Sequence, residues 1–491
     1  MSFQLQNILI YLLLLPLVGI VSIFFLPSWN NLIIKKTALL FSSFSIILSV
    51  YLLIFFNLSQ GQFQFYLNFS WISNLNFSLI LGIDGISLFF ILLTNLLIFL
   101  CILISWNSIK HNLKLYFSLF FFLNFLLIGV FCALDLLLFY IFFESVLIPM
   151  YFIIGFWGSR ARKIRAAYFF FLYTLLGSVL FLLTIVYLYY QVGTTNFEIL
   201  STVSFTLKEQ KFLWLSFFVS FATKIPMVPV HLWLPEAHVE APTSGSVILA
   251  GILLKLGTYG LIRFLFPFFP QSCYYFSPLV YSIAAISIVY TSLTAIRQTD
   301  FKRIIAYTSI AHMNVVILGL FSFNVIGIEG AILQSLSHGF VASALFTIIG
   351  VVYDRYHTRT VKYYGGLVHV MPIYIFIFLF FTMSNIGLPG TGSFIGELLI
   401  FTGSFQTNIF ITVIGATSMI LGGCYSLWLF NRIAYGNLKT QYIEKFVDLN
   451  KREFYIFLPF IIGTVIIGLY PNIFLNPIHL SVNLLIQLMQ F

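Results

Sequence analysis

The chain has 491 residues, of which 60% are hydrophobic and 8% are charged, and its mean hydropathy is +1.04. Soluble domains carry about 25% charged residues, so this composition excludes a soluble enzyme and indicates a protein that crosses a membrane many times. The net charge of +10 comes mostly from short connecting segments, a pattern of charges at membrane surfaces and not of nucleic-acid binding. The four cysteines stand singly, which gives no sign of an iron–sulfur site or a disulfide framework.

Apolar runs long enough to cross a bilayer, which takes about 20 residues, fill most of the chain. They predict roughly 14 spanning helices. The runs cover residues 5–26, 36–57, 83–106, 113–133, 135–157, 166–190, 211–238, 243–267, 277–297, 303–322, 326–352, 371–404, 408–434 and 454–475. Asp84 is expected to cap the third of these helices. No connecting segment is long enough for a soluble domain, so we expect a single all-α, polytopic membrane domain over residues 1–491.

The seventh run contains a feature that an ordinary membrane helix avoids. The segment TKIPMVPVHLWLPEAH at 223–238 holds three prolines and follows directly on from apolar sequence. Prolines free backbone carbonyls that lipid cannot satisfy, so a broken helix survives at membrane depth only inside protein or beside a polar cavity. This run is therefore predicted to line an ion path.

A second break, SNIGLPGTGSFIGE at 384–397, interrupts another apolar run. Paired interrupted helices at corresponding positions are typical of inverted-repeat transporters. The two halves are predicted at 113–267 and 277–434. Glycine-rich breaks also occur in simple kinked helices, so this pairing alone does not decide the matter.

Three ionisable residues of the first half stand in mid-run, at Glu144, Lys224 and Lys255. A lysine at the bilayer centre costs about 2.5–3.5 kcal/mol on insertion scales, and intramembrane ionisable groups are functional by default. Glu144 is expected to pair with a lysine and tune its proton affinity, although a carboxylate that only packs between helices is the alternative. Lys224 is expected to be such a lysine, although its side chain could instead extend to the membrane interface. Lys255 stands among Gly251, Gly257 and Gly260, which permit close helix packing and so favour an inward-facing lysine.

Four histidines and one more glutamate extend this series. His231 and His238 follow Lys224 at intervals of seven, a spacing that would put them on one helical face if the prolines left the helix regular. Either a proton relay or a structural hydrogen bond would explain them. His312 and His338 lie in separate runs, where each alone could be a packing residue. With Lys224 and Lys255 they would form a chain of protonatable groups through the bilayer, and Glu397, after the second break, would be its acidic end. Phosphate-binding, dinucleotide-binding and HExxH zinc motifs are absent from the sequence.

The motifs resemble those of the antiporter-like membrane subunits of respiratory complex I. KIPMVPVHLWLPEAHVEAPTSGSVILAGILLKLGTYG carries the resemblance, and GIDGISLFF, FYIFFESVLIPMY, QTDFKRIIAYTSIAHMN and GLPGTGSFIGE match in the same order over essentially the whole chain. Glu397 stands where sister subunits carry lysine, which points to one particular member of the family. Plastid and cation-antiporter homologues share the long motif.

The resemblance implies a bundle of 14 spanning helices with two inverted five-helix repeats, which pumps protons when quinone is reduced elsewhere. It implies that Glu144 and Lys224 form the family's ion pair, that Lys255 is the central lysine and that Glu397 is the exit carboxylate. The histidines connecting them would be His231, His238, His312 and His338. Flavin, iron–sulfur clusters, NADH and ubiquinone would be bound by partner subunits, with no cofactor or metal in this chain.

Three other functions remain open at this stage. A subunit of a monovalent cation/proton antiporter would use the same buried groups, a passive scaffold of the membrane arm would use none of them, and a quinone-binding redox subunit is the weakest rival because the chain offers no redox centre. The high phenylalanine content and the lack of a presequence favour a mitochondrial inner-membrane protein over one of a bacterial plasma membrane.

Overall fold

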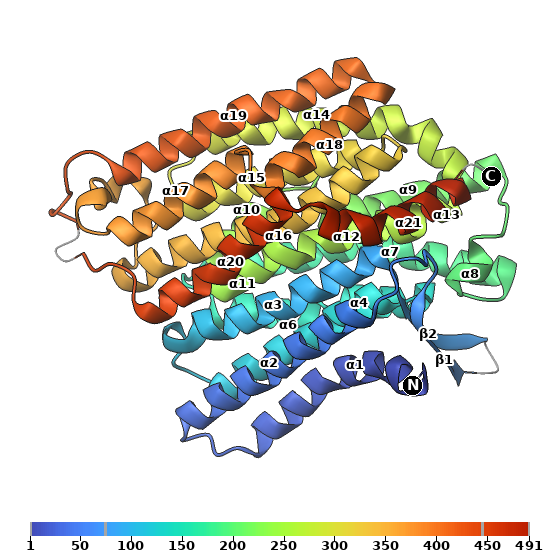
Figure 1. Ribbon diagram of the computed structural model, residues 1–491, viewed down its shortest axis with the longest axis horizontal. Helices are drawn as coiled ribbons and strands as arrows, with labels where there is room; N and C mark the ends of the chain where they lie inside the picture. The colour runs from blue at the N-terminus through green and yellow to red at the C-terminus, as the bar shows by residue number, and fades with distance from the viewer. Residues whose placement is uncertain (1, 73–75, 443–445, 490–491) are drawn as a thin grey trace.

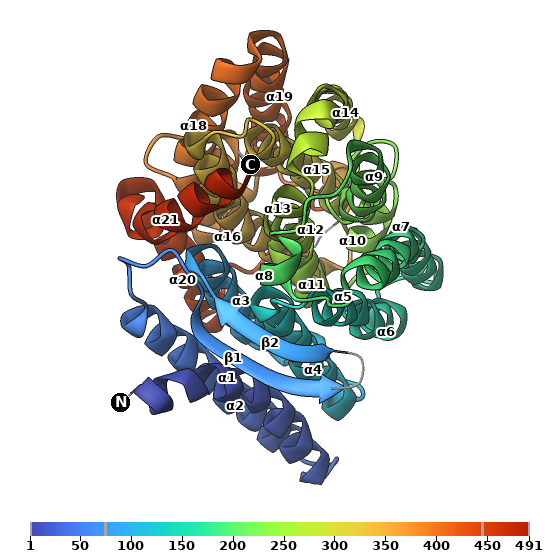
Figure 2. The ribbon, with the colours of Figure 1, turned by 90° about the vertical axis from the view of Figure 1, so that its right-hand side faces the viewer.

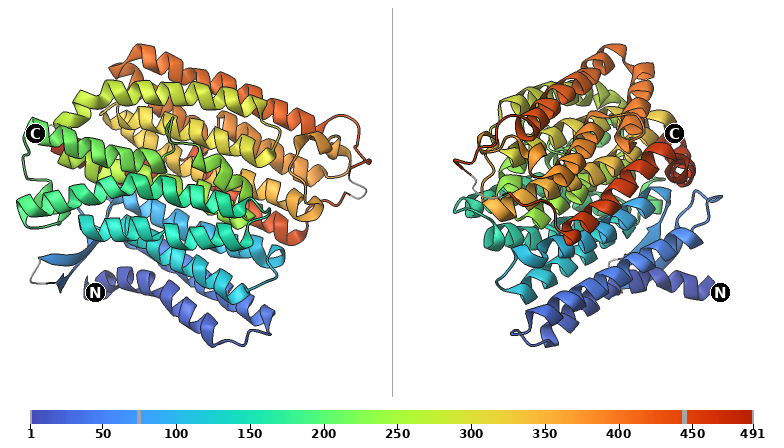
Figure 3. Two further views of the ribbon diagram at one scale, coloured as in Figure 1. Left: turned by 180° about the vertical axis from the view of Figure 1, so that it is seen from behind. Right: turned by 60° about the vertical axis from the view of Figure 1, so that its left-hand side comes forward.

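Long apolar helices that run along one another build the molecule, and the computed structural model describes residues 2–72, 76–442 and 446–489 (Figure 1). The first helices are α1 (Ser2–Phe25), α2 (Asn31–Phe55), α3 (Gly85–Ser108), α4 (Leu113–Cys132), α5 (Leu136–Ser145), α6 (Leu147–Trp157), α7 (Lys163–Val192) and the short α8 (Phe197–Leu200). Views from two other sides show α1 and α2 at one edge of the bundle and the orange helices of the second half at the other (Figure 3).

The middle of the chain supplies the centre of the bundle. It comprises α9 (Leu207–Lys224), α10 (Trp233–Glu240), α11 (Thr243–Ile248), α12 (Leu254–Gly260), α13 (Phe266–Phe268), α14 (Pro270–Arg297), α15 (Phe301–Leu320) and α16 (Val325–Tyr356). The last helices are α17 (Pro372–Ile386), α18 (Gly392–Thr407), α19 (Ile409–Ala434), α20 (Lys451–Leu469) and α21 (Asn472–Met489). The two short 3-10 turns Val361–Tyr363 and Leu367–His369 lie between α16 and α17.

Within the described ranges, 13 helices are long and apolar enough to cross a membrane. Two further predicted spans, 211–238 and 371–404, are each two helices separated by a nonhelical break. The helix α21 was not predicted from sequence. It continues across the bundle from α20 (Figure 1), and both pack against α3 and α16. The predicted polytopic helix bundle with broken helices is therefore confirmed.

A β-hairpin, which the sequence reasoning did not find, lies across one end of the helices (Figure 2). Strand β1 (Gln64–Ile72) pairs antiparallel with β2 (Phe77–Ile83). The Leu134 amide, just after α4, donates to the Ile80 carbonyl at 2.9 Å. After the hairpin, Asp84 caps α3 by accepting from the Ser87 amide at 3.0 Å, as predicted. The hairpin thus ties the ends of α3 and α4 together.

The first break, between α9 and α10, is stable because side chains replace the lost helical partners. The Trp233 indole donates to the Thr223 carbonyl at 2.9 Å, and the Val228 amide donates to Ser287 Oγ at 3.0 Å. Both Trp233 and Thr223 are buried. Irregular backbone is tolerated at membrane depth only when protein satisfies it in this way.

The helix after this break is irregular on both sides of Lys255. Residues 243–268 form one fully buried span, and two π-helical turns, Leu249–Leu253 and Leu261–Leu265, flank the α-helical turn that holds Lys255. A π turn disturbs the regular i→i−4 ladder and often marks a functional site. The Lys255 ammonium donates to the Ala250 carbonyl in the preceding π turn.

The second break, between α17 and α18, depends on glycine. Gly387 ends α17 with a φ of +89°, and Gly390 has a φ of +92°, values that a residue with a Cβ rarely adopts. Ser393 Oγ donates to the Ser384 carbonyl at 2.6 Å across the break. The predicted interruption at 384–397 is confirmed.

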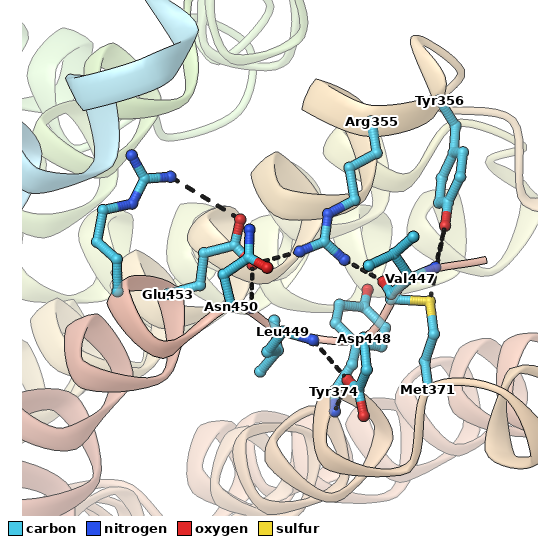
Figure 4. A network of polar contacts seen from close by, with 10 residues as sticks. Arg355, Tyr356, Met371, Tyr374, Val447, Asp448, Leu449, Asn450 and Glu453 are labelled. Carbon is cyan, nitrogen blue, oxygen red and sulfur yellow. Dashed lines mark hydrogen bonds and ion pairs between the residues drawn. The ribbon is translucent and has the colours of Figure 1, made fainter. Parts of the chain in front are cut away.

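The segment before α20 fastens three helix ends together (Figure 4). Asp448 accepts from the Ile373 and Tyr374 amides at 3.0 and 3.1 Å, which caps the first turn of α17. Arg355, near the end of α16, donates to the Val447 carbonyl and pairs with Glu453 at the start of α20. This network fixes the membrane-surface ends of α16, α17 and α20 relative to one another.

Candidate functional site: a buried polar axis

Glu144 and Lys224 lie near each other but not in contact. Lys224 is the last residue of α9 and is 3% exposed. Its ammonium lies 4.5 Å from the centroid of the Phe143 ring, a cation–π contact. Both carboxylate oxygens of Glu144 are buried without a hydrogen-bond partner. Among the described residues, none of the ion pairs joins these two, although each lies within the electrostatic reach of the other.

Glycines hold the helix of Lys255 tightly against the helix of Lys224. A Cβ on Gly257 would lie 2.5 Å from Ile225 Cγ1 and 3.0 Å from the Phe221 carbonyl oxygen, and one on Gly260 would overlap the Phe221 ring. Gly251 faces the other way, where a Cβ would lie 2.7 Å from Ser343 Oγ on α16. The close packing expected from these three glycines is therefore present, and it points Lys255 inward.

Lys255 is completely buried, and its ammonium contacts His338. Its Nζ lies 2.8 Å from His338 Nδ1 on α16. The His338 ring lies 5.9 Å, between centroids, from the ring of His312 on α15. Three separate helices thus place these protonatable groups one after another in space.

His312 connects this series to Glu397. His312 Nδ1 lies 3.1 Å from Glu397 Oε1, and Gln334 Nε2 donates to the same oxygen at 3.1 Å. Glu397 is 2% exposed and stands on α18 just after the second break. Gly387 leaves room for it, since a Cβ there would lie 3.2 Å from Glu397 Oε2.

A small cavity of about 10 Å³ lies beside this series. Its lining includes His312, Gln334, His338, Asn385 and Ser393. A volume of about 10–15 Å³ on this measure admits one water molecule when polar partners surround it. The series from Lys255 to Glu397 is therefore nearly continuous, with direct contacts at both ends and room for one water molecule beside the two histidines in its middle.

His231 and His238 are placed differently. His231 lies in the break itself, outside any helix, with its ring edge-on to Tyr290 at 5.7 Å. His238 lies in α10 and stacks on Phe346 at 4.5 Å. Both nitrogens of both rings are buried and have no hydrogen-bond partner. The seven-residue spacing therefore does not place these histidines on one helical face, because α10 begins only at Trp233.

Several buried polar residues near the axis were not singled out from sequence. Gln334 donates to Glu397 and lines the small cavity together with His312 and His338. It is uncharged, so it does not stand out in the sequence. Lys302, at the start of α15, stands beside basic residues in the sequence, a position typical of a surface charge, yet it is only 1% exposed. Arg263 pairs with Asp84 at 2.6 Å beneath the hairpin. Such pairs depend on tertiary contacts that no local pattern reveals.

Asp135, between α4 and α5, caps the start of α5. It accepts from the Leu137 and Leu138 amides at 2.9 and 3.0 Å and from Thr195 Oγ1 at 2.6 Å. Burial raises the pKa of the Asp135 carboxyl, against the opposing effect of these hydrogen bonds. Over the part of the chain that the structure describes, no group of three or more His, Cys, Asp or Glu residues could hold a metal ion.

The fold and the axis define a polytopic helical membrane protein with ionisable groups through its middle. The chain belongs to the NADH:quinone oxidoreductase/Mrp antiporter transmembrane family, whose model matches residues 133–427. It is similar to the NADH-ubiquinone oxidoreductase chain 4 of Marchantia polymorpha, at 55% identity over 97% of this chain and 96% of that protein. The chain 4 of Chondrus crispus is 55% identical over 99% of both chains.

A solved structure agrees with these sequence relationships. A chain of respiratory complex I from Thermus thermophilus with bound NADH superimposes with a TM-score of 0.89, at 26% identity, over 98% of this chain and 99% of that one. The resemblance drawn from the motifs is thereby confirmed, and the member of the family that Glu397 indicated is chain 4.

Proposed function

We propose that this chain is the proton-translocating subunit of respiratory complex I that corresponds to chain 4, in the mitochondrial inner membrane. The observation that carries the proposal is the continuous series from Lys255 through His338 and His312 to Glu397, with successive contacts of 2.8 and 3.1 Å at its ends. Near-full-length identity of 55% to chain 4 proteins supports the assignment. A buried series of protonatable groups is the arrangement that proton relays use.

In the mechanism that we propose, Lys224 holds a proton while Glu144 is near. Opposite charges attract strongly where the dielectric constant is low, so movement of Glu144 away from Lys224 would release the proton toward Lys255. The series from Lys255 to Glu397 would then carry it onward, with His231 and His238 serving the first half. The present geometry corresponds to the separated pair, because Lys224 rests on Phe143 and Glu144 has no partner.

Two inverted repeats at 113–267 and 277–434 would explain why the axis contains two similar breaks. The break after Lys224 and the break before Glu397 each lie between two short helices at membrane depth. Half-helix ends of this kind bring backbone dipoles to buried ions. The corresponding ends therefore support a role for both lysine and glutamate.

The redox chemistry would belong to other subunits. In this proposal the chain holds no redox centre, and NADH, FMN, the iron–sulfur clusters and ubiquinone are bound by partners. Those partners include the sister antiporter-like subunits of the membrane arm, and lipid covers the remaining surface. The many large apolar side chains exposed on the outer helices support both kinds of contact.

Substitution of Lys224 tests the function directly. Lys224→Ala is expected to lower NADH-driven proton pumping by about a hundredfold, since a positioned proton-transfer group contributes roughly 10²–10⁴-fold, while the complex still assembles. Pumping would be measured in proteoliposomes, and assembly on a native gel stained for NADH dehydrogenase activity. Lys208→Ala, an exposed lysine on the same helix, is the matched control. Normal pumping by an assembled Lys224→Ala complex would overturn the mechanism.

A cation/proton antiporter subunit is the second candidate, because the family that the chain belongs to includes antiporters. Sodium-dependent proton flux without NADH would favour it, as would migration on the native gel apart from NADH dehydrogenase activity. A passive scaffold would instead make every substitution on the axis act through assembly alone.

A further inference from the structure

A second polar region lies at the end of the bundle where the segments that follow α6, α10, α14, α16 and α19 meet. The Ser159 amide donates to the Glu240 carbonyl at 3.0 Å, the Phe301 amide donates to the Arg359 carbonyl at 3.0 Å, and Lys439 donates to the Lys362 carbonyl at 2.7 Å. These contacts bring the segments near 160, 300, 360 and 440 to one face. Those segments carry the exposed or partly exposed Arg160, Arg162, Arg303, Lys362 and Lys439, together with the buried Arg359.

A cavity of about 230 Å³ opens at this cation-rich face and reaches a buried carboxylate. The exposed Arg160 and Arg162 stand at its rim, and Glu240 forms part of its lining. Glu240 is only 2% exposed, and its Oε2 has no hydrogen-bond partner. A buried, unsatisfied carboxylate oxygen is costly unless water or function accounts for it. The cavity has room for several water molecules, and a water molecule there would satisfy this oxygen.

Lys302 lies directly behind Glu240. Its Nζ donates to the Ala241 carbonyl at 2.7 Å and to Ser246 Oγ at 3.2 Å. Ser246 in turn donates to the His238 carbonyl at 3.2 Å. Glu240 and His238 both lie within the electrostatic reach of Lys302. The other charged groups that act on Lys302 are Arg359, Asp300 and Asp354.

His238 completes the connection. Its ring nitrogens are buried without a partner, and it lies within the electrostatic reach of both Lys302 and Lys255. Capping of the C-terminal end of α10 by Lys302 would explain the contact with Ala241. It would explain neither the free nitrogens of His238 nor the free oxygen of Glu240. Both orphaned groups lie on α10, whose C-terminal end Lys302 contacts at the Ala241 carbonyl.

We infer that Glu240 and Lys302 are proton-transfer residues that connect the water-filled cavity at the cation-rich face, through His238, with Lys255. The inference rests on the proposed function and adds the place where the axis exchanges protons with the aqueous phase. In each transfer one O–H or N–H bond breaks as the next forms: Glu240 takes the excess proton of a hydronium ion in the cavity and gives it to neutral Lys302. Lys302 then protonates His238 and is neutral again, and His238 gives the proton to Lys255. The charge moves inward and no other reactant is needed.

Two substitutions separate proton transfer from capping, measured in the assembled complex in proteoliposomes. Glu240→Gln keeps the size and polarity of the side chain but cannot carry a proton. Lys302→Arg keeps a cation that can still cap α10, yet an arginine does not release its proton. Each variant is expected to lower NADH-driven pumping and ubiquinone reduction about tenfold or more and to raise the ratio of rates in H₂O and D₂O. Glu198→Gln and Lys208→Arg, both exposed, are the controls.

Recovery by other proton carriers provides the readout that a structural role would not move. Glu240→Asp should regain part of the activity, and added formate should speed ubiquinone reduction by Glu240→Gln but not by Glu397→Gln. Normal pumping and an unchanged isotope ratio in both Glu240→Gln and Lys302→Arg, with pumping lost in Glu397→Gln, would overturn the port while the proposed function stands. Normal pumping in all three would overturn both. If Glu240→Gln fails to assemble, Lys302→Arg and Glu240→Asp decide by the same measurements.

Discussion

The two halves of the polar axis are built differently. From Lys255 to Glu397 the groups form a nearly continuous series, with Lys255 and His338 2.8 Å apart and His312 and Glu397 3.1 Å apart. In the first half Glu144 has no partner and Lys224 rests on the Phe143 ring. A continuous series suits conduction, whereas separated charges have two arrangements of different energy. We therefore propose that the first half of the axis controls proton release and that the second half conducts.

The strongest way to break this comparison is to remove the end of the continuous half. Glu397→Gln keeps the hydrogen bonds that His312 and Gln334 can make but removes the charge. Pumping should fall about a hundredfold while the complex remains assembled. The measurement is acidification in proteoliposomes driven by NADH, with Glu198→Gln as the exposed control. Normal pumping would show that the path does not end at Glu397.

Histidine substitutions compare the halves directly. His338→Phe interrupts the contact with Lys255 and should lower pumping about tenfold or more. His231→Phe removes two imidazole nitrogens that have no hydrogen-bond partner in this arrangement, so its effect on pumping should be smaller. Pumping rates of the two variants, each normalised to assembled complex, give the ratio. Equal losses would contradict a continuous second half and a discontinuous first half.

The Phe143 ring tests the switch. A cation–π contact in a desolvated site is worth about 2 kcal/mol, so Phe143→Leu should favour movement of Lys224 toward Glu144. Protons pumped per NADH oxidised should fall, by less than in Lys224→Ala. Phe152→Leu, on the partly exposed outer side of α6, is the control. An unchanged ratio in Phe143→Leu would mean that the ring does not stabilise the separated state.

The packing of α12, which carries Lys255, against α9, which carries Lys224, is expected to affect stability. Gly257→Ala would push a methyl group against Ile225 and the Phe221 carbonyl, and overpacking of this kind costs about 1–3 kcal/mol. Less assembled complex should be recovered, or its thermal midpoint should fall. Gly155→Ala is the matched control, since its Cβ would meet Ala167 at 4.0 Å. Equal stability of both variants would show that α9 and α12 can move apart freely.

The smallest effect is expected away from the axis. Asp448→Ala removes the cap of α17 shown in Figure 4, which costs about 1 kcal/mol. The thermal midpoint should fall slightly while pumping per assembled complex stays the same. Reduced pumping at unchanged stability would tie this network to transport.

The class of protein was predictable from the sequence, and the ionisable residues could be picked out as candidates, because charges in apolar runs stand out against lipid. Both breaks were predictable from Pro226, Pro229 and Pro235 and from the glycines near 390. The hairpin at 64–83 and the helix α21 were not, since neither is a long, uniformly apolar run. The separation of Glu144 from Lys224 was also out of reach, because it depends on where the Phe143 ring packs. Lys302 was misread for a related reason: its position beside basic residues resembles a surface charge, and only the fold buries it.

Lys255 joins the two halves of the polar axis, so its substitution is the most direct test of a proton path through that axis. Lys255→Met nearly preserves the shape of a fully buried side chain and removes the only protonatable atom of that residue. The account predicts an assembled complex, present at normal abundance on a native gel, that has lost NADH-driven proton pumping by this chain, with Lys208→Met unaffected. Pumping at the normal ratio of protons to NADH in assembled Lys255→Met would contradict a proton path through the axis.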